Sequence, residues 1–277
     1  MSRAYDALVL DMDGTLLDDA DQVPPRTAAA IQRVRERGVK VMLATGRSHQ
    51  GVREIASKLA LDVPSIVFNG AGVYDLREDR LLSCFTLPES LVGSLIAYAR
   101  AHALEPVVAR AEGQFARMAR PEEQSLLTGF VHLTQCPESE LPRAEVLRVT
   151  LFSQHHTESL VLYEEIQRAL AGYPAYCTHF ALAALPGFRS SSAQVVDVQP
   201  DCAGKAEALK LLSDRFGIPP ERVVAVGDAG NDVPILRAVG LGVAMGNATP
   251  AVQAIAARVI GTNNSSALAE LIETVFD

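Results

Sequence analysis

Two carboxylates lie two residues apart near the start of the chain, in the segment DMDGTL at residues 11–16. Asp11 and Asp13 directly follow the apolar run Ala7–Leu10, which is typical of a strand buried on both faces of a parallel sheet. Beyond the carboxyl end of such a strand, a carboxylate can act as a nucleophile or a metal ligand. Gly14 permits a tight turn whose backbone N–H groups point toward an anion. A turn with two solvent-exposed acids is the alternative interpretation.

Two further segments offer groups that bind phosphate. Thr45-Gly46-Arg47 follows the apolar run Val39–Ala44, and its hydroxyl and backbone N–H suit a phosphoryl oxygen, although a helix N-cap explains Thr45 equally well. Lys205 is expected to open a helix, where a cation is unfavourable against the helix dipole. An anion beside Lys205 would offset that cost, whereas a lysine that points into solvent is the alternative.

A fourth segment, GDAGND at residues 227–232, follows the apolar run Val223–Val226. Asp228, Asn231 and Asp232 bring two acids and an amide into a glycine-rich turn. Mg²⁺ prefers one or two carboxylates together with phosphate and water, so this composition favours a magnesium site. An Asx-type turn with a capping aspartate is the alternative. Together, the four segments supply a nucleophile, a second acid, phosphate donors, a cation and metal ligands at one predicted sheet edge.

An α/β sheet is needed to bring these segments together. Apolar runs alternate with helical patterns at both ends of the chain, which predicts a doubly wound, mainly parallel α/β sheet. The expected strands are 7–10, 39–44, 64–68, 194–198, 223–226 and 241–244, and the expected helices are 27–37, 50–59, 205–216, 233–239 and 250–257.

The middle of the chain has a different pattern, rich in hairpins. It contains a hairpin at 73–75 and 81–85, helices at 90–102 and 158–170, and strands at 104–110, 114–118, 144–152, 175–180 and 182–186. This mixture predicts a separate α+β cap domain inserted into the sheet domain. We therefore expect a discontinuous core at 1–78 and 190–277 and a cap at 79–189.

The composition excludes several classes of function. The net charge is -8 and no run of basic residues occurs, so we expect no nucleic-acid polymer and no anionic membrane as partner. No apolar stretch reaches the length of about 18 residues that a membrane span requires, and we expect no signal peptide in the first residues, which lack a long apolar region. The four cysteines are scattered, which fits reduced thiols and a cytoplasmic location.

DMDGTL, ATGR, Lys205 and GDAGND, in this order, resemble the four motifs of the haloacid dehalogenase superfamily. The large insertion lies between the second and third motifs. With Asn69-Gly70 before it and MGNA at 245–248 near the end, this placement resembles the Cof-type phosphatase branch with a C2-type cap.

The resemblance implies a Mg²⁺-dependent phosphatase for a small phosphorylated metabolite, such as a sugar phosphate, a nucleotide or a cofactor phosphate. Asp11 would form an aspartyl-phosphate, and Asp13 would protonate the leaving group and then activate water. Asp11, Asp228 and the Asp13 carbonyl would bind Mg²⁺. Phosphate contacts are implied for Met12, Thr45, Gly46, Lys205 and Asn231, and a supporting role at the metal for Asn231 and Asp232. A sugar phosphomutase and a catalytically silent phosphate-binding module are the alternatives.

Overall fold

The computed structural model describes residues 4–118, 133–185, 188–202 and 204–276. The chain divides into two compact units, one formed by Met1–Ser83 with Ala203–Asp277 and the other by Cys84–Cys202. The first unit is therefore discontinuous in sequence, and the second is inserted into it.

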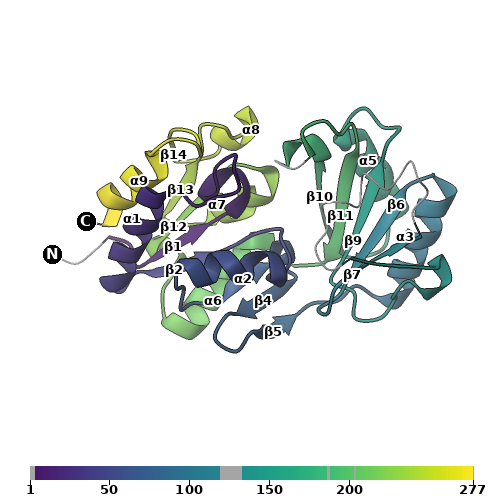
Figure 1. The fold of residues 1–277 in the computed structure, drawn as a ribbon, viewed down its shortest axis with the longest axis horizontal. Coiled ribbons are helices and arrows are strands. Elements are labelled where there is room, and N and C mark those ends of the chain that lie inside the picture. Colours follow the sequence, from purple (N-terminus) through teal and green to yellow (C-terminus); the bar gives the residue numbers. More distant parts are fainter. Residues whose placement is uncertain (1–3, 119–132, 186–187, 203, 277) are drawn as a thin grey trace. The chain divides into compact units, whose positions relative to one another are not determined.

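The centre of the first unit is a five-stranded parallel sheet in the order β14-β13-β12-β1-β2 (Figure 1). Its strands are β1 Ala7–Leu10, β2 Lys40–Leu43, β12 Val223–Gly227, β13 Leu241–Ala244 and β14 Arg258–Val259. The central strand β1 is completely buried, because neighbours flank it on both edges and helices cover both faces. The predicted parallel sheet is confirmed. The exposed two-residue strand β14 was not predicted, since so short a segment carries no periodic pattern.

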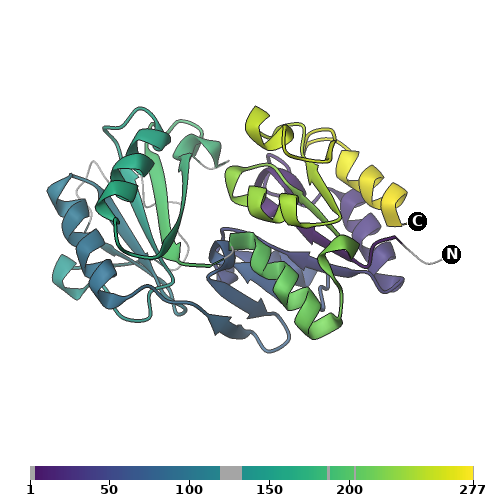
Figure 2. The same cartoon turned by 180° about the vertical axis from the view of Figure 1, so that it is seen from behind.

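Helices cover both faces of this sheet, which makes it doubly wound. α1 (Pro25–Glu36) and α2 (His49–Lys58) lie on one face, and α6 (Glu207–Phe216) and α7 (Val233–Ala238) on the other (Figures 1 and 2). Each helix turns an apolar stripe toward the strands, as the helical spacing of their buried residues requires. The short helix α8 spans Pro250–Gln253, and α9 (Ala267–Phe276) packs beside α1.

The third apolar run behaves differently from the prediction. β3 (Ser65–Val67) touches β2 through a single parallel bridge between Ala44 and Ile66. It belongs instead to a small three-stranded sheet with β4 (Gly72–Asp75) and β5 (Arg80–Cys84). The chain reverses immediately after β3 because Phe68 and Asn69 both adopt left-handed backbone conformations.

The inserted unit holds a six-stranded sheet in the order β10-β11-β9-β6-β7-β8. One pair, β7 with β8, is parallel and the other described pairs are antiparallel. α3 (Glu89–Ala101) and α5 (Ser159–Ala169) share a hydrophobic cluster with this sheet. The strands are β6 Glu105–Ala109, β7 Gln114–Arg117, β8 Leu133–Cys136, β9 Arg148–Ser153, β10 Ala175–Ala181 and β11 Gln194–Pro200.

The structure corrects several predictions for the insertion. The run at 194–198 was assigned to the core, but β11 pairs with β9 and β10 in the inserted sheet. A short valine-rich run is typical of a buried strand in either kind of sheet, so the sequence could not distinguish them. The second boundary therefore falls after Cys202 rather than residue 189, and the first after Ser83 rather than residue 78. The strand predicted at 182–186 is a short helical turn over Leu182–Ala184, and residue 186 lies outside the described residues. β8 was missed.

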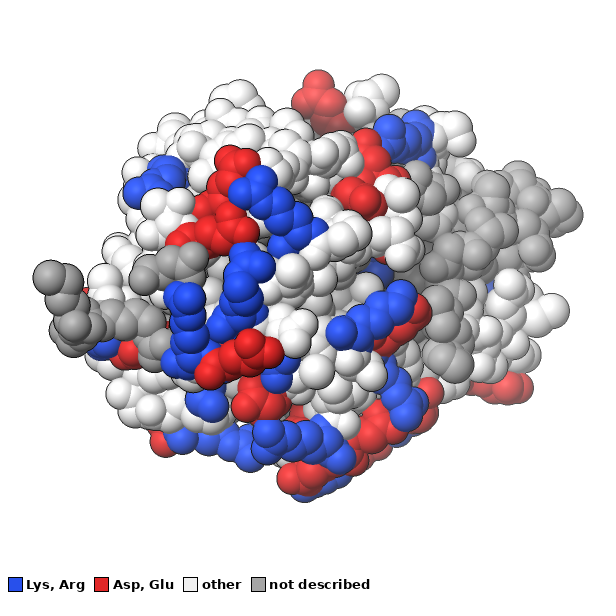
Figure 3. Space-filling model, turned by 60° about the vertical axis from the view of Figure 1, so that its left-hand side comes forward, with Lys and Arg blue, Asp and Glu red and all other residues white. Residues whose placement is uncertain are grey.

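The surface carries both signs of charge. On the face shown in Figure 3, basic and acidic side chains are interspersed rather than segregated. Exposed ion pairs link α1 to α9, including Arg26 with Glu270 at 3.1 Å and Arg33 with Glu273 at 2.6 Å. Exposed pairs of this kind contribute about 0–1 kcal/mol each. Among the described residues, no helix combines the length and the apolar character that crossing a membrane requires.

Candidate active site

The loop after β1 presents the first acid. Asp11 follows the strand directly, and only 6 % of it is exposed. Residues Met12–Leu16 form a tight turn in which Gly14 has a φ of 73°. A Cβ on Gly14 would overlap the carboxylate of Asp228, so glycine is required both for the backbone conformation and for space. The side chain of Met12 is fully buried, which leaves its backbone as the part that borders the turn.

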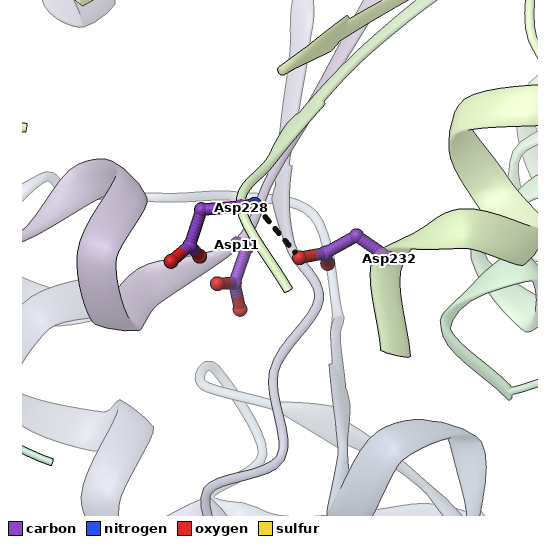
Figure 4. Close-up of side chains that lie close together, drawn as sticks. All are labelled: Asp11, Asp228 and Asp232. Atoms are coloured by element: carbon purple, nitrogen blue, oxygen red, sulfur yellow. Dashed lines mark hydrogen bonds between the residues drawn. The ribbon is translucent and has the colours of Figure 1, made fainter. Parts of the chain in front are cut away.

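Three carboxylates gather at the end of the central strands. Asp11, Asp228 and Asp232 each place an oxygen within 4.8 Å of the others. Figure 4 shows these three side chains close together. Asp11 and Asp228 come together because β1 and β12 are parallel neighbours and each acid lies at a strand end. Asp232 approaches from the turn before α7. Within the described part of the chain, this is the cluster of acidic side chains with the geometry to hold a metal ion.

Lys205 is buried among these acids, with 1 % of its side chain exposed. Its Nζ donates to Asp11 Oδ1 at 2.5 Å and to Asp232 Oδ1 at 2.7 Å. Burial alone would lower the pKa of Lys205, but the charges of Asp11 and Asp232 raise it above its ordinary value. The two carboxylates therefore favour the charged form of the lysine. The anion that the sequence predicted beside Lys205 is supplied by the protein itself.

One ammonium does not neutralise three carboxylates. Burial raises the pKa of Asp11 well above its usual range, the charge of Asp232 raises it further, and Lys205 offsets only part of this. Burial, with a further contribution from Asp232, also raises the pKa of Asp228 to about 6. With all three acids ionised, the cluster retains two uncompensated negative charges, so its electrostatics favour a bound cation.

Asp232 accepts hydrogen bonds from Lys205 and from the turn that carries Asp228. Its Oδ1 accepts from Lys205, and its Oδ2 accepts the backbone N–H groups of Asp228 and Ala229, both at 3.0 Å. Both oxygens are therefore engaged within the protein. The arrangement orients the lysine and the turn that carries Asp228, and it agrees with a supporting position rather than a direct metal contact.

The segment after β2 brings Thr45, Gly46 and Arg47 to the same edge. Thr45 is buried, and its Oγ1 accepts the backbone N–H of Arg47 at 3.1 Å. α2 begins at His49 and its N-cap position is Ser48, so the alternative of Thr45 as the N-cap does not hold. A Cβ on Gly46 would lie 3.0 Å from the side-chain oxygen of Asn69, so the glycine makes room for that amide.

Arg47 pairs with the second acid of the first motif. Its Nε donates to Asp13 Oδ2 at 3.0 Å, and its Nη2 donates to Asp13 Oδ1 at 2.6 Å and to Asp21 Oδ1 at 2.5 Å. Burial would lower the pKa of Arg47, but the hydrogen bonds with both acids raise it. The sequence placed Arg47 beside Thr45 without assigning it a role, and this pairing was missed.

Two asparagines join the second and last motifs. Asn231 Nδ2 donates to Asn69 Oδ1 at 2.9 Å, and the backbone N–H of Asn69 donates to the carbonyl of Thr45 at 2.9 Å. Among the described residues, Asn231 Oδ1 is buried without a hydrogen-bond partner. Asn69 was not predicted as a site residue. Its position just after the apolar strand β3 could have indicated it, because Thr45 was predicted from the same kind of position after β2.

Two more residues support Asp228. Thr15 Oγ1 donates to Asp228 Oδ1 at 3.2 Å, and Asn247 Nδ2 lies 2.8 Å from the Gly14 carbonyl and 3.4 Å from Asp228 Oδ2. Asn247 Oδ1 in turn accepts the backbone N–H of Asn263 at 3.0 Å. Neither Thr15 nor Asn247 was predicted. Both lie in motifs noted in the sequence, Thr15 in DMDGTL and Asn247 in MGNA, and these positions could have indicated their roles.

Comparison with known proteins places this site in a family. Residues 8–272 match the family of haloacid dehalogenase-like hydrolases. The pyridoxal phosphate phosphatase YbhA of Escherichia coli (strain K12) is 29 % identical over 285 residues, covering 96 % of each chain. The HMP-PP phosphatase of Serratia proteamaculans (strain 568) is 31 % identical over 274 residues, covering 97 % of this chain and 94 % of the relative.

A solved structure agrees with these relatives. A phosphatase of the haloalkanoate enzyme superfamily from Bacteroides thetaiotaomicron superposes with a TM-score of 0.79 at 25 % identity, covering 99 % of this chain and 96 % of that one. The match thus includes the inserted unit as well as the core. The family match spans nearly the whole sequence, and the chain therefore belongs to the haloacid dehalogenase-like hydrolases, in their phosphatase branch.

Proposed function

We propose that the chain is a Mg²⁺-dependent phosphatase that removes phosphate from a small phosphorylated metabolite through an aspartyl-phosphate at Asp11. The observation that carries the proposal is the cluster of three carboxylates, two of which, Asp11 and Asp232, accept hydrogen bonds from the buried Lys205. When all three acids are ionised, the two negative charges that Lys205 does not compensate match a divalent cation, and Asp11 lies in this cluster at the end of the central strand. The relatives support the substrate class, since one is named for its action on pyridoxal phosphate.

The residues present fit a hard cation held by oxygen. We assign Asp11, Asp228 and the backbone carbonyl of Asp13 as its ligands, because both oxygens of Asp232 are already engaged. Bound Mg²⁺ would reduce the repulsion between the acids and an incoming phosphate and stabilise charge during transfer. Within the described part of the chain, Asn231 Oδ1 is a buried acceptor without a hydrogen-bond partner. It suits water around a cation better than a phosphoryl oxygen, which is itself an acceptor.

Asp11 acts first in the proposed reaction. A carboxylate needs no separate base when it is ionised, and Lys205 orients this one through Oδ1. An oxygen of Asp11 bonds to phosphorus while the bond between phosphorus and the leaving oxygen breaks. Asp13 gives its proton to that oxygen, so the leaving group departs as an alcohol. Backbone groups at Met12 and Gly46, with Thr45 and Lys205, are the proposed contacts of the phosphoryl oxygens.

Water completes the cycle. Asp13, now a carboxylate, accepts a proton from a water molecule as that water attacks phosphorus. The bond between phosphorus and Asp11 breaks, phosphate leaves, and both acids return to their starting states. A phosphomutase would use the same two acids but would return the phosphoryl group to a substrate hydroxyl.

A panel of phosphorylated metabolites tests the function. The purified protein with Mg²⁺ is given p-nitrophenyl phosphate, pyridoxal phosphate, hexose phosphates and nucleoside monophosphates, and both free phosphate and isomeric products are measured. We expect phosphate release without isomers, loss of release in EDTA, and recovery when Mg²⁺ is restored. Isomers without phosphate would indicate the mutase, inactivity on every compound would support a silent phosphate-binding module, and EDTA-resistant turnover would contradict the metal assignment.

Asn247→Ala tests the support of the proposed metal ligand. It removes the amide that lies between the Gly14 carbonyl and the carboxylate of Asp228. We expect Mg²⁺ affinity to fall about 10–100-fold, as is usual when a partner of a metal ligand is lost. Calorimetric titration with Mg²⁺ measures this directly.

The matched control for Asn247 is Asn264→Ala. Asn264 is an exposed asparagine whose Oδ1 accepts the backbone N–H of Asp19. Its substitution should leave Mg²⁺ affinity within about twofold of the parent, since it touches none of the three carboxylates. Equal affinities for the parent and Asn247→Ala would remove Asn247 from the metal site.

A further inference from the structure

Arg47 donates two parallel hydrogen bonds to the carboxylate of Asp13. Nε donates to Oδ2 at 3.0 Å and Nη2 to Oδ1 at 2.6 Å, so the planar guanidinium faces the planar carboxylate edge to edge. A paired fork of this kind fixes the rotation of the carboxylate as well as its position. Within the described residues, Arg47 supplies both of the side-chain hydrogen bonds that this carboxylate accepts. The pair is partly buried, with side-chain exposures of 28 % and 29 %.

Arg47 is itself held in place from the other side. Its Nη2 also donates to Asp21 Oδ1 at 2.5 Å. Asp21 lies in a turn whose shape is set by Asp18, because Asp18 Oδ1 accepts the backbone N–H groups of Ala20 and Gln22. Arg47 follows the carboxyl end of β2 and therefore contacts both Asp13 and the turn that contains Asp21.

Asp13 lies in a tight turn rather than in a regular helix or strand. Asp13 has an extended conformation (φ -72°, ψ 123°) inside the tight turn, and Gly14 follows it in a left-handed conformation. An acid that must deliver a proton to one particular oxygen loses rate steeply when it is misplaced by about 1 Å. Among the side-chain contacts of the described residues, the paired hydrogen bonds from Arg47 restrict where the Asp13 carboxyl can lie.

We propose that Arg47 is a positioning residue for the acid–base steps and acts through Asp13 rather than by binding the phosphoryl group. This inference rests on the proposed function, in which Asp13 protonates the leaving oxygen. Loss of Arg47 must harm substrates that need a proton on the leaving group, and it must spare those that do not.

Two substrates of one enzyme separate these cases. With an alkyl phosphate such as glucose 6-phosphate, the leaving group departs as a basic alkoxide unless its oxygen is protonated. With p-nitrophenyl phosphate, the leaving group is a stable phenolate that needs no proton. The value of kcat/KM reports the step in which the leaving group departs, so it is measured for both. Asp13→Asn sets the reference pattern, with a loss of about 10²–10⁴-fold on the alkyl substrate and a smaller loss on the aryl one.

For Arg47→Gln, we expect kcat/KM to fall about 10–100-fold with glucose 6-phosphate and less than about threefold with p-nitrophenyl phosphate. The inhibition constant of inorganic phosphate should change less than about threefold, because the phosphoryl contacts remain. Arg47→Lys should recover part of the loss, since an ammonium restores charge without the paired fork. Arg53→Gln is the matched control, being an exposed arginine on α2 paired with Asp79, and it should match the parent.

Other results would overturn the inference. Equal losses on both substrates, or phosphate inhibition weakened in proportion to the loss of kcat/KM, would assign Arg47 to phosphoryl binding instead. Circular dichroism of both Arg47 variants identifies a folding defect, and the Lys variant must still show the alkyl-selective pattern. Inactivity of the unsubstituted protein on both substrates would contradict the proposed function as well. An active parent with a uniform loss in the variants contradicts only the role of Arg47.

Discussion

Asp11→Asn is expected to lower phosphate release by at least about 10⁴-fold, because it removes the nucleophile and with it the covalent route. The change is nearly isosteric. It also removes a buried carboxylate. Because burial and the charge of Asp232 raise the pKa of Asp11, removing its charge relieves repulsion in the folded state. We therefore expect a cooperative thermal transition like that of the parent. Phosphate release and circular dichroism measure the two effects.

The matched control for Asp11 is Asp214→Asn, an exposed aspartate on α6. It should retain full turnover, because a surface carboxylate far from the strand ends has no part in the reaction. Near-normal turnover by Asp11→Asn would refute the aspartyl-phosphate mechanism. Loss of the thermal transition in Asp11→Asn would instead show that the carboxylate is needed for folding.

Lys205→Met is expected to abolish turnover and to destabilise the protein at the same time. The ammonium is the cation that Asp11 and Asp232 share inside the core, and methionine leaves both acids without it. Removing one partner from a buried ion pair costs about 3–5 kcal/mol, because a buried charge is left uncompensated. The unfolding midpoint in urea should fall accordingly. It is followed by circular dichroism, since the chain contains no tryptophan.

A second substitution separates the two effects of Lys205→Met. Adding Asp232→Asn to it removes one of the stranded charges, so part of the lost stability should return while turnover stays absent. Lys210→Met on the exposed side of α6 is the matched control and should shift stability by no more than about 0.5 kcal/mol. A stable, active Lys205→Met protein would contradict both the charge balance and the proposed phosphate contact.

The sequence was most informative where a local pattern determines structure. Ala7–Leu10 was predicted with the bounds that β1 has, since it is a fully apolar run that lies between Asp6 and Asp11. Leu241–Ala244 was also predicted with the bounds of β13. The gathering of Asp11, Thr45 and Asp228 followed from their places at the ends of parallel strands. Lys205 was noticed because a cation at a helix start needs an anion.

The remainder depends on contacts that no local pattern records. Arg47 reaches Asp13 across 34 residues, and Asn247 reaches Gly14 across 233, through side-chain conformations that packing selects. β11 was assigned to the wrong sheet for a related reason. A valine-rich run predicts a buried strand but not its neighbours in the sheet, and the partners of β11 are β9 and β10.

The discontinuous core also has a consequence for synthesis on the ribosome. β1 is an inner strand, yet its neighbour β12 lies more than 200 positions later, after the whole inserted unit. At about 5–20 residues per second, roughly 10–40 s pass between the emergence of the two strands. During that interval one edge of β1 lacks its partner, and Asp11 lacks the lysine that is to accompany it. The nascent amino-terminal segment therefore exposes an unpaired strand edge, which is open to pairing with another chain until the carboxyl-terminal segment arrives.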